Sequence, residues 1–420
     1  MKPTCKRLLS LVLALTMALS LSIAPVWAAE EADAGEDASL ATQGVWWRGT
    51  CGKSAQWDTD WNDEEGTCTL IISGTGAVSR DFVCEDKTTE FSFEDRVWRI
   101  CVEEGITSVP NLCRQFYHCT DLILPGSLGK LEEKRFARSE DEEDDCYALA
   151  RVTIGEGVTK IGDRAFQGCE NLKQVRLPES LSAIPKGLFL DCYRLNDIQI
   201  PEGVASIGGN AFASTGLTEL VIPGSVKSIG KNTFEGCSSL SSITLKDGLK
   251  TIDDEAFLDC GKLKALTVPQ SVTSIGPGAL GIRDYDSLED EVERTPGFVL
   301  SGWTGSAAEV YALRYGIKFR SIGELSKPSK TSLTSAKAKN GKKMEVKWRK
   351  NTGGLGYELQ CSTDKKFKKN VKTVKIYYNS TTSKTVSKLK AGKKYFLRIR
   401  TSKGSLTSGW SEVKSATAKK

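Results

Sequence analysis

The only histidine of the chain, His118, is the residue on which most enzymatic chemistry would depend. A Ser-His-Asp or Cys-His arrangement uses an imidazole as its base, so any such site must be built around this residue. Cys119 follows it directly and Cys113 lies five residues before it, which places three zinc-binding side chains in one stretch. Structural zinc takes four ligands with tighter cysteine spacing. The sequence therefore favours a surface or packed histidine, and it predicts no enzyme, no metal and no cofactor.

Two further stretches have incomplete ligand-binding patterns. The spacing Asp58-x-Asp60-x-Asn62 matches the start of a calcium loop, but the sixth position is Asp63 where such loops require glycine. The pair Gly74-x-Gly76 follows a strand-like run, but the third glycine that opens a helix in phosphate-binding loops is missing. We interpret the first stretch as part of a hairpin turn and reject the second as a phosphate site.

An acidic insertion offers a fourth possibility for chemistry. Six acidic residues run from Glu140 to Asp145 between two apolar stretches. A run of like charges is typical of a solvated loop, which is the interpretation that we favour. The alternative is a site for a cation or a basic partner.

The elements that would position these residues are set by a repeat. A phrase of about 23 residues recurs from Leu149 to Ile282, with the form L-x-x-L-x-L followed by an apolar pair and a phenylalanine. A period of 20–29 residues with this pattern is typical of leucine-rich repeats. Each phrase predicts a short strand with its apolar residues on one side, and stacking of successive coils buries them. The phenylalanines of this column are Phe166, Phe189, Phe212, Phe234 and Phe257.

The other side of these strands is the candidate binding face. Residues that flank the inward position of each strand point to solvent, and Arg151 and Arg176 are the side chains expected to anchor a partner, because arginine is common in interface hot spots. The alternative is a solvated sheet without a ligand, and the exposed Trp46, Trp47 and Trp61 are rival contact residues. The predicted ligand-binding residues are Arg151, Thr153, Gln174, Arg176, Asp197, Gln199 and Glu219, and the face continues with the less polar or uncharged Val221, Ser242, Thr244, Ala265 and Thr267.

A glycine follows the second isoleucine of most repeats. This slot suggests a left-handed turn, but Pro185 fills it in one repeat, and proline requires a negative φ. We therefore predict that the glycines allow close packing of neighbouring coils. They are Gly162, Gly208, Gly230 and Gly276.

Two groups stand out among the 13 cysteines. Cys51 and Cys68 lie outside the repeats, and a disulfide between them is left open. A second group recurs in the register of the phenylalanine column, where Cβ atoms stacked at the strand spacing lie too far apart for disulfides. We predict that this group consists of buried free thiols: Cys146, Cys169, Cys192, Cys237 and Cys260.

The two ends of the repeat array carry their own signals. Residues 283–295 are highly charged and predict a loop or a frayed helix. The following segment predicts a strand, a short helix capped by Ser306 and Gly316, and another strand. Near the C-terminus, the spacing of Leu389, Gly392 and Tyr395 predicts the tyrosine corner of a β-sandwich.

Charge is distributed unevenly along the chain. Residues 326–420 contain 26 Lys and Arg against 4 Asp and Glu, a net charge of +22, while the remainder is acidic. Such a segment would be attracted to anionic wall polymers. The alternative is that it docks on the acidic part of the same chain. Nucleic acid is not a predicted partner, because the lysines are not interleaved with stacking aromatic residues.

The order of these features gives the predicted domain organisation. The N-terminal basic residues, apolar run and Val26-Trp27-Ala28 are typical of a secretory signal, and no later run is long enough to span a membrane. The predicted parts are a signal peptide (1–28), a disordered spacer (29–45), an N-terminal β cap (46–95), the repeat solenoid (96–282), a C-terminal cap (283–323), a linker (324–331) and a β-sandwich (332–420).

The repeat phrase Ile161-Gly-Asp-Arg-Ala-Phe-Gln-Gly-Cys169 resembles the BspA-type leucine-rich repeats of bacterial surface proteins. The entry segment beginning at Gly49 and the exit segment beginning at Gly305 are similar to the flanks in that family, and residues 332–420 resemble a bacterial fibronectin type III domain. The implied fold is a β-rich α/β repeat solenoid with a β-hairpin N-cap and a separate all-β sandwich. The implied function is adhesion or another contact with host or microbial surface proteins by a secreted or cell-surface protein. A purely structural envelope protein is the alternative.

Overall fold

The computed structural model describes residues 48–62, 67–79, 96–138, 146–286, 288–289 and 291–419. The chain divides into two compact units, unit 1 within Met1–Ser182 and Asp191–Pro201 and unit 2 within Ala183–Leu190 and Glu202–Lys420. The predicted signal peptide, the spacer, Trp46, Trp47 and the acidic insertion lie outside the described residues. The described part is rich in strands and contains one α-helix. The prediction of a β-rich fold is therefore confirmed, whereas the α/β part of the predicted class is not.

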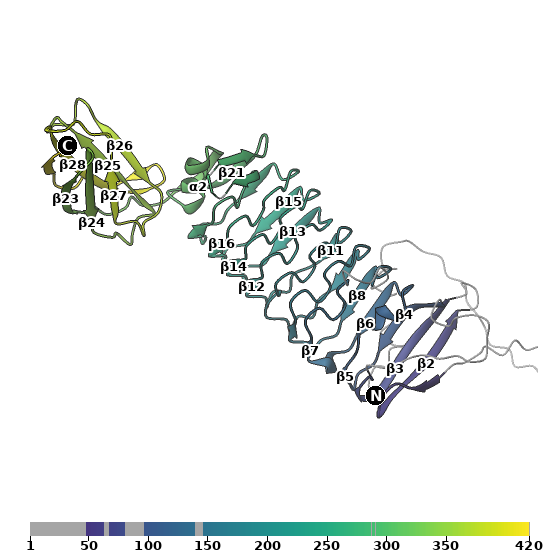
Figure 1. The fold of residues 1–420 in the computed structure, drawn as a ribbon. Helices are drawn as coiled ribbons and strands as arrows, with labels where there is room; N and C mark the ends of the chain where they lie inside the picture. Colours follow the sequence, from purple (N-terminus) through teal and green to yellow (C-terminus); the bar gives the residue numbers. More distant parts are fainter. Residues whose placement is uncertain are drawn as a thin grey trace, which may run out of the picture. The chain divides into compact units, whose positions relative to one another are not determined.

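Unit 1 is organised around one sheet with the strand order β1-β2-β3-β4-β6-β8-β10-β11, and β5 also pairs with β3 (Figure 1). β2 and β3 form the predicted antiparallel hairpin, and every pairing from β3 onward along the sheet is parallel. β7 and β9 form a second, two-stranded parallel sheet. The elements are β1 (Arg48–Thr50), β2 (Ser54–Asn62), β3 (Thr67–Ala77), β4 (Val97–Val102), β5 (Ile106–Ser108), η2 (Leu112–Arg114), β6 (Asp121–Leu124), η3 (Gly126–Leu128), β7 (Lys130–Leu131), β8 (Arg151–Ile154), β9 (Lys160–Ile161), β10 (Gln174–Arg176) and β11 (Asp197–Ile198).

The L-x-x-L-x-L phrase explains the core of unit 1. Val152, Val175 and Ile198 pair in register on adjacent parallel strands, and all three are buried. Behind them Phe136 and Phe166 stack with ring centroids 5.5 Å apart. Alternation along each strand therefore sends one set of side chains into the core and the next set to solvent.

The repeats of unit 2 form the same two layers. One parallel sheet has the order β12-β14-β16-β18, and the strands of the L-x-x-L-x-L phrases form β13-β15 and β17-β21-β22. Residues of the exit segment thus supply β21 and β22. The elements are β12 (Ser206–Ile207), β13 (Glu219–Ile222), β14 (Ser228–Ile229), β15 (Ser242–Leu245), β16 (Thr251–Ile252), β17 (Ala265–Thr267), β18 (Ser274–Ile275), β19 (Ile282–Asp286), β20 (Glu291–Arg294), β21 (Val299–Thr304), α2 (Ala307–Tyr315) and β22 (Lys318–Glu324).

A column of phenylalanines forms the centre of these repeats. The ring centroids of Phe189, Phe212, Phe234 and Phe257 follow one another at 5.6, 5.5 and 4.9 Å, with interplanar angles below 30°. All four rings are buried, and Leu280 continues the column with a smaller buried side chain. The predicted phenylalanine stacking is confirmed within each unit.

The glycine slot of the repeat is explained by close packing, as predicted. A Cβ atom on Gly230 would lie 2.6 Å from the backbone nitrogen of Gly209 in the preceding coil, and one on Gly162 would lie 2.3 Å from that of Glu133. Neither glycine has a positive φ. The left-handed residue comes two positions later and is usually not glycine, as in Asn232 with a φ of 56°.

Residues 283–295, predicted to be a loop or frayed helix, instead contribute to an antiparallel hairpin of β19 and β20. The Arg283 guanidinium lies 3.1 Å from the Glu293 carboxylate across the two strands, so charges that suggested a loop also hold the strands together. The predicted helix caps of α2 are confirmed. Ser306 Oγ accepts from the backbone N–H of Glu309, and Gly316 ends the helix with a φ of 64°.

The C-terminal part of unit 2 is a two-sheet sandwich. One sheet has the order β23-β24-β27, and the other has the order β26-β25-β28-β29 with β30 on β28. They enclose a core that includes Trp348, Tyr357 and Ile399. The predicted tyrosine corner is present, because Tyr395 Oη accepts from the backbone N–H of Lys390 at 2.9 Å. The strands are β23 (Leu333–Lys339), β24 (Lys343–Trp348), β25 (Gly356–Ser362), β26 (Lys372–Ile376), β27 (Ser383–Val386), β28 (Lys394–Lys403), β29 (Leu406–Thr407) and β30 (Lys414–Thr417).

The five cysteines predicted to be buried free thiols, from Cys146 to Cys260, are so. Four of them donate from Sγ–H to backbone carbonyls of the phenylalanine column, as from Cys237 to Phe212 O at 3.0 Å, and Cys146 donates to Asn111 Oδ1. Cys51 and Cys68 are also free. A bridge between them is excluded because Cys68 pairs with Trp61 near one end of the hairpin, whereas the N–H of Cys51 bonds to Ala55 O near the other. Cys101 is disulfide-bonded.

Candidate functional site

The predicted binding residues lie on the exposed side of the L-x-x-L-x-L strands. In unit 1, side chains alternate along β8, β10 and the chain at β11, so each predicted residue is exposed or half-buried while its neighbours are buried. Glu219 is exposed in the same way on β13 of unit 2. The structure brings six of the seven together on one sheet face of unit 1: Arg151, Thr153, Gln174, Arg176, Asp197 and Gln199.

The two expected anchors are already engaged by carboxylates. Arg151 donates to both carboxylate oxygens of Asp121, at 2.5 and 2.7 Å, and Arg176 donates to both oxygens of Asp197, at 2.8 and 3.1 Å. Gln174 adds a further hydrogen bond to Asp197. These bidentate pairs fix the guanidinium planes on the sheet. Each arginine is therefore pre-oriented, but a partner must compete with its carboxylate.

The ion pairs also shift the pKa values of Asp197 and Arg151. The hydrogen bonds from Arg176 lower the pKa of Asp197, against a smaller opposing effect of burial. The hydrogen bonds to Asp121 raise the pKa of Arg151. Both shifts favour the charged forms of Asp197 and Arg151, so this face carries charges of both signs.

Asp121 is a site residue that the sequence analysis did not identify. It occupies the same strand position as Arg151, one residue before the inward apolar side chain, and it lies between Arg99 and Arg151 in the parallel register. Its side chain is 12% exposed, far less than the 55% of Arg151. Aligning the worn repeat of β6 with the later ones would have placed it on the face.

Arg99, Asp121 and Arg151 border a groove of about 340 Å³ in unit 1. Strands β2, β3, β4, β6 and β8 supply its walls, and Trp98 on β4 is 45% exposed beside it. Of the rival aromatic residues, only Trp61 is described, and it is half-buried at the same groove. The groove-lining residues are Asp60, Trp61, Thr67, Cys68, Thr69, Trp98, Arg99, Thr120, Asp121 and Arg151.

His118 belongs to an aromatic cluster next to this groove. Its ring is stacked with Trp98 at a centroid distance of 6.4 Å and lies 4.6 Å from the ring of Tyr117. The imidazole is exposed, whereas Cys113 and Cys119 are buried, so the three candidate zinc ligands do not converge. Within the described residues, no three His, Cys, Asp or Glu side chains are arranged to hold a metal ion.

The buried thiols form their own hydrogen-bonded group. Cys113 is hydrogen-bonded to Cys119 and Cys146, which lowers the pKa of Cys113, while burial raises the pKa of the other two. All three are closed to solvent. We assign them to the core.

Asp58 and Asp60 do not form a calcium loop, nor do they lie in a turn. Both are in β2, where they pair with Ile71 and Thr69 of β3. Their side chains therefore share one face of a strand, and Asp60 lines the groove.

A row of exposed tyrosines extends from this cluster in unit 1. Tyr147 and Tyr193 each follow a cysteine that begins a turn, in which a backbone N–H bonds to a carbonyl three residues earlier, whereas Tyr117 follows Phe116 in the turn that precedes Cys119. They are 38, 53 and 54% exposed. Tyrosine is enriched in binding interfaces. The spacing after the cysteine column would have revealed Tyr147 and Tyr193 in the sequence.

The corresponding face of unit 2 extends beyond the predicted residues. The sheet continues through β21 and β22, which add Trp303, Arg320 and the 47%-exposed Ile322 to the serines and threonines of β15 and β17. A groove of about 760 Å³ runs over these strands. Arg320 Nε donates to Ser301 Oγ at 3.1 Å. The sequence signals in this segment predict only a cap that closes the repeat array. They do not indicate that Trp303, Arg320 and Ile322 point outward.

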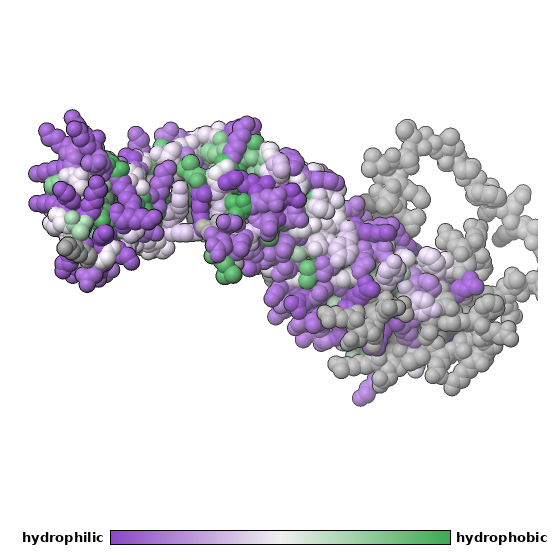
Figure 2. All heavy atoms as spheres, turned by 45° about the horizontal axis from the view of Figure 1, so that its top comes forward, coloured by the Kyte–Doolittle hydropathy of each residue, from purple (hydrophilic) through white to green (hydrophobic). Residues whose placement is uncertain are grey.

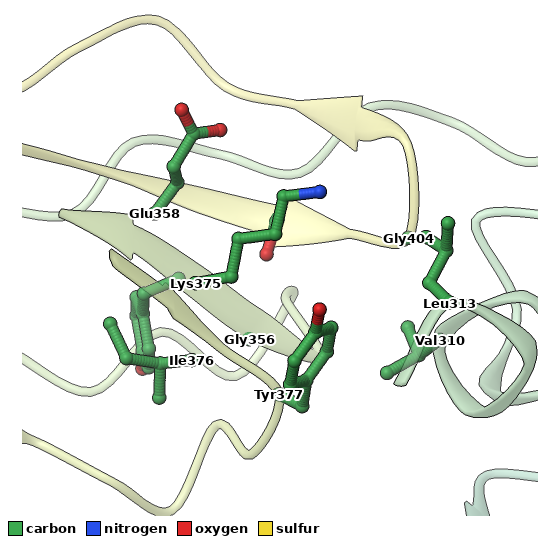
Figure 3. A pocket seen from close by; sticks show the side chains of 10 residues that line it. Val310, Leu313, Gly356, Glu358, Lys375, Ile376, Tyr377 and Gly404 are labelled. Atoms are coloured by element: carbon green, nitrogen blue, oxygen red, sulfur yellow. The ribbon is translucent and has the colours of Figure 1, made fainter. Parts of the chain in front are cut away.

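The remaining cavity and surface features give weaker evidence for a binding site. A cavity of about 30 Å³ lies between α2 and the sandwich, with Val310 and Leu313 on one side and Tyr377 on the other (Figure 3). It is large enough only for about one or two water molecules. On the face shown in Figure 2, hydrophilic residues cover most of the described surface and hydrophobic ones form small separate patches. No described helix has the length and apolar character to cross a membrane.

Comparison with known proteins agrees with the repeat architecture. Residues 115–238 and 205–284 match the family profile described as BspA type leucine rich repeat region, in six copies. No match was found among curated proteins. Residues 115–284 are thus similar to leucine-rich repeat regions of the BspA type, and no catalytic family is indicated.

Similar solved structures include two bacterial leucine-rich proteins. A leucine rich cell surface protein from Faecalibacterium prausnitzii A2-165 is 22% identical with a TM-score of 0.30, over 57% of this chain and 74% of that chain. The leucine rich repeat protein of T. pallidum is 22% identical with a TM-score of 0.32, over 52% and 78%. An Fn3-like protein from Clostridium thermocellum is 20% identical with a TM-score of 0.20, over 23% and 97%.

Proposed function

We propose that this protein is a secreted or cell-surface interaction protein of a bacterium, which binds other proteins through the exposed sheet face and tyrosine row of its repeats. The observation that carries the proposal is the set of exposed Trp98, Tyr117, Tyr147 and Tyr193 beside pre-oriented arginines. Tyrosine, tryptophan and arginine are the residues that dominate interface energies. The BspA-type repeat region supports a surface role. Adhesion is the specific form that we infer.

The experiment is a pull-down of host-matrix and envelope extracts with the chain from residue 29 onward. Arg176→Asp combined with Asp197→Arg is the matched variant, since it keeps an ion pair on the sheet while exchanging its charges. Binding through this face should weaken in the exchanged variant and in Tyr193→Ser. Partners retained equally by all three proteins would place the contact elsewhere.

We propose that the C-terminal sandwich is a fibronectin type III-like domain that attaches the protein to anionic cell-wall polymers. The strand order around a tyrosine corner supports the first part, and the net charge of +22 supports the second. Attraction of this kind is screened beyond about 8 Å at physiological salt. Binding to isolated walls should therefore fall as salt is added, and salt-independent binding would contradict it.

A purely structural envelope role is the second candidate. It is favoured by the carboxylates that already pair with Arg151 and Arg176, because paired guanidiniums have fewer hydrogen-bond donors left for a partner. The same pull-down separates the two roles. A structural protein would retain no partner that the face variants release.

A further inference from the structure

The groove of unit 1 has a composition unlike that of the rest of the sheet face. Among the described residues, its charged walls contain two carboxylates, Asp60 and Asp121, and two guanidiniums, Arg99 and Arg151, so their charges cancel. Three threonine side chains complete the polar lining. A groove with cancelled charge offers no net attraction to a polyanion or a polycation. It favours a neutral ligand with many hydrogen-bonding groups.

The hydrogen-bonding groups in the groove are held in place by one another. Asp121 accepts from Arg151 through both oxygens, and it also accepts from Thr120 Oγ1 at 2.7 Å. Arg99 approaches the same carboxylate at 3.9 Å. Because these side chains are fixed before a ligand arrives, binding does not have to order them, which lowers its entropic cost.

An aromatic surface stands next to these polar groups. The indole of Trp98 is 45% exposed, and the stacked imidazole of His118 and the tilted ring of Tyr117 lie on its flank. Aromatic faces carry negative charge density and attract weakly positive C–H groups.

We propose that this groove binds a neutral saccharide, with a sugar ring against Trp98 and its hydroxyls on the Asp121–Arg151 pair. A pyranose presents C–H groups on its faces and hydroxyls on its rim, and each hydroxyl both donates and accepts. Carboxylates that only accept and guanidiniums that only donate can satisfy both functions of neighbouring hydroxyls. The volume of about 340 Å³ falls within the roughly 300–1,000 Å³ of small-molecule sites. This site goes beyond protein binding by the repeats and does not depend on it.

The experiment is affinity electrophoresis of the chain from residue 29 onward in native gels containing soluble neutral polysaccharides: a mixed-linkage glucan, a laminarin, a galactomannan and a glycol chitin. Polygalacturonate serves as the anionic comparison. At least one neutral polysaccharide should retard the wild-type protein, and added salt should not release it. Trp98→Ala should raise the dissociation constant roughly fivefold, because an aromatic contact contributes about 1 kcal/mol beyond its area.

Three variants complete the test. Trp98→Phe should retain most of the retardation, Asp121→Asn should weaken it, and Tyr378→Ala, an exposed aromatic residue of the sandwich, should not change it. Melting curves identify any variant that fails to fold. Absence of retardation by every neutral polysaccharide, or equal retardation of wild type and Trp98→Ala, would overturn the proposal. Retardation only by polygalacturonate and abolished by salt would assign the binding to the basic sandwich instead.

Discussion

Replacing Phe212 by alanine should open the central repeats of unit 2 without disturbing the sandwich. The ring of Phe212 is completely buried and is stacked between Phe189 and Phe234 at 5.6 and 5.5 Å. Truncation of a buried phenylalanine costs about 3–5 kcal/mol. Each coil contacts only its neighbours, so the loss should appear as local opening of adjacent coils.

Cys237 reports this opening directly. Its Sγ–H donates to the carbonyl of Phe212 at 3.0 Å, and the thiol is buried, so a thiol reagent reaches it only when the coil opens. A loss of about 3 kcal/mol raises the open population, and hence the labelling rate at pH 8, by roughly a hundredfold. Cys361 in the sandwich core provides the internal reference. Mass spectrometry of the labelled peptides measures both sites in one sample.

Two comparisons sharpen the result. Phe212→Leu should raise labelling of Cys237 only slightly, since Leu280 already occupies the same column position in a native coil. Adding Phe234→Ala should give a combined loss that departs from the sum of the single losses by roughly 1 kcal/mol, because the two rings are in contact. If Phe212→Ala left labelling of Cys237 unchanged, or accelerated that of Cys361 equally, the reasoning from the column would be refuted.

Three further predictions concern packing, pH and thiols. Gly230→Ala should destabilise the chain by about 1–3 kcal/mol in urea titrations, because its Cβ would lie 2.6 Å from Gly209 N, whereas Gly261→Ala, with open space around it, should be nearly neutral. Arg176 lowers the folded-state pKa of Asp197, so its contribution to stability is complete above the unfolded pKa of about 3.9 and is lost as pH falls through the folded value. Melting curves of Asp197→Asn should show a weaker pH dependence across this range, and an unchanged one would contradict the pairing. The ten described free thiols are buried, so native protein should react with Ellman's reagent far more slowly than protein in guanidinium, and an immediate native reaction would show that the coils are open.

The sequence was most informative where one residue type is required at one place in every coil. The phenylalanine column and the glycine slot could be predicted because stacked coils repeat the same packing constraint. The argument from Pro185 against a left-handed turn at that slot is confirmed by Gly230, and the left-handed residue is Asn232. Helix α2 was predictable because Ser306 and Gly316 give local signals at its two ends.

The sequence-based predictions failed where two interacting residues are distant in sequence, or where charged residues form strands. The hairpin of β19 and β20 is charged enough to suggest a loop, and its strands are held partly by the Arg283–Glu293 pair. The carboxylate that binds Arg151 lies 30 residues away, on Asp121, in a worn repeat whose register was fixed only for its apolar positions. Cross-strand pairing of outward residues depends on that register, so the site was less predictable than the core.

The chain contains an internal comparison that separates folding from binding. The turn position held by Tyr147 and Tyr193 in unit 1 is held by Glu170 in another coil of that unit and by Ser238 and Gly261 in unit 2, with the same backbone hydrogen bond across the turn. A coil therefore forms without an aromatic residue at this position. Since the tyrosine rings lie largely in solvent, they contribute little to the core. Changing them to serine should leave stability intact, so any partner lost by those variants is lost through recognition and not through unfolding.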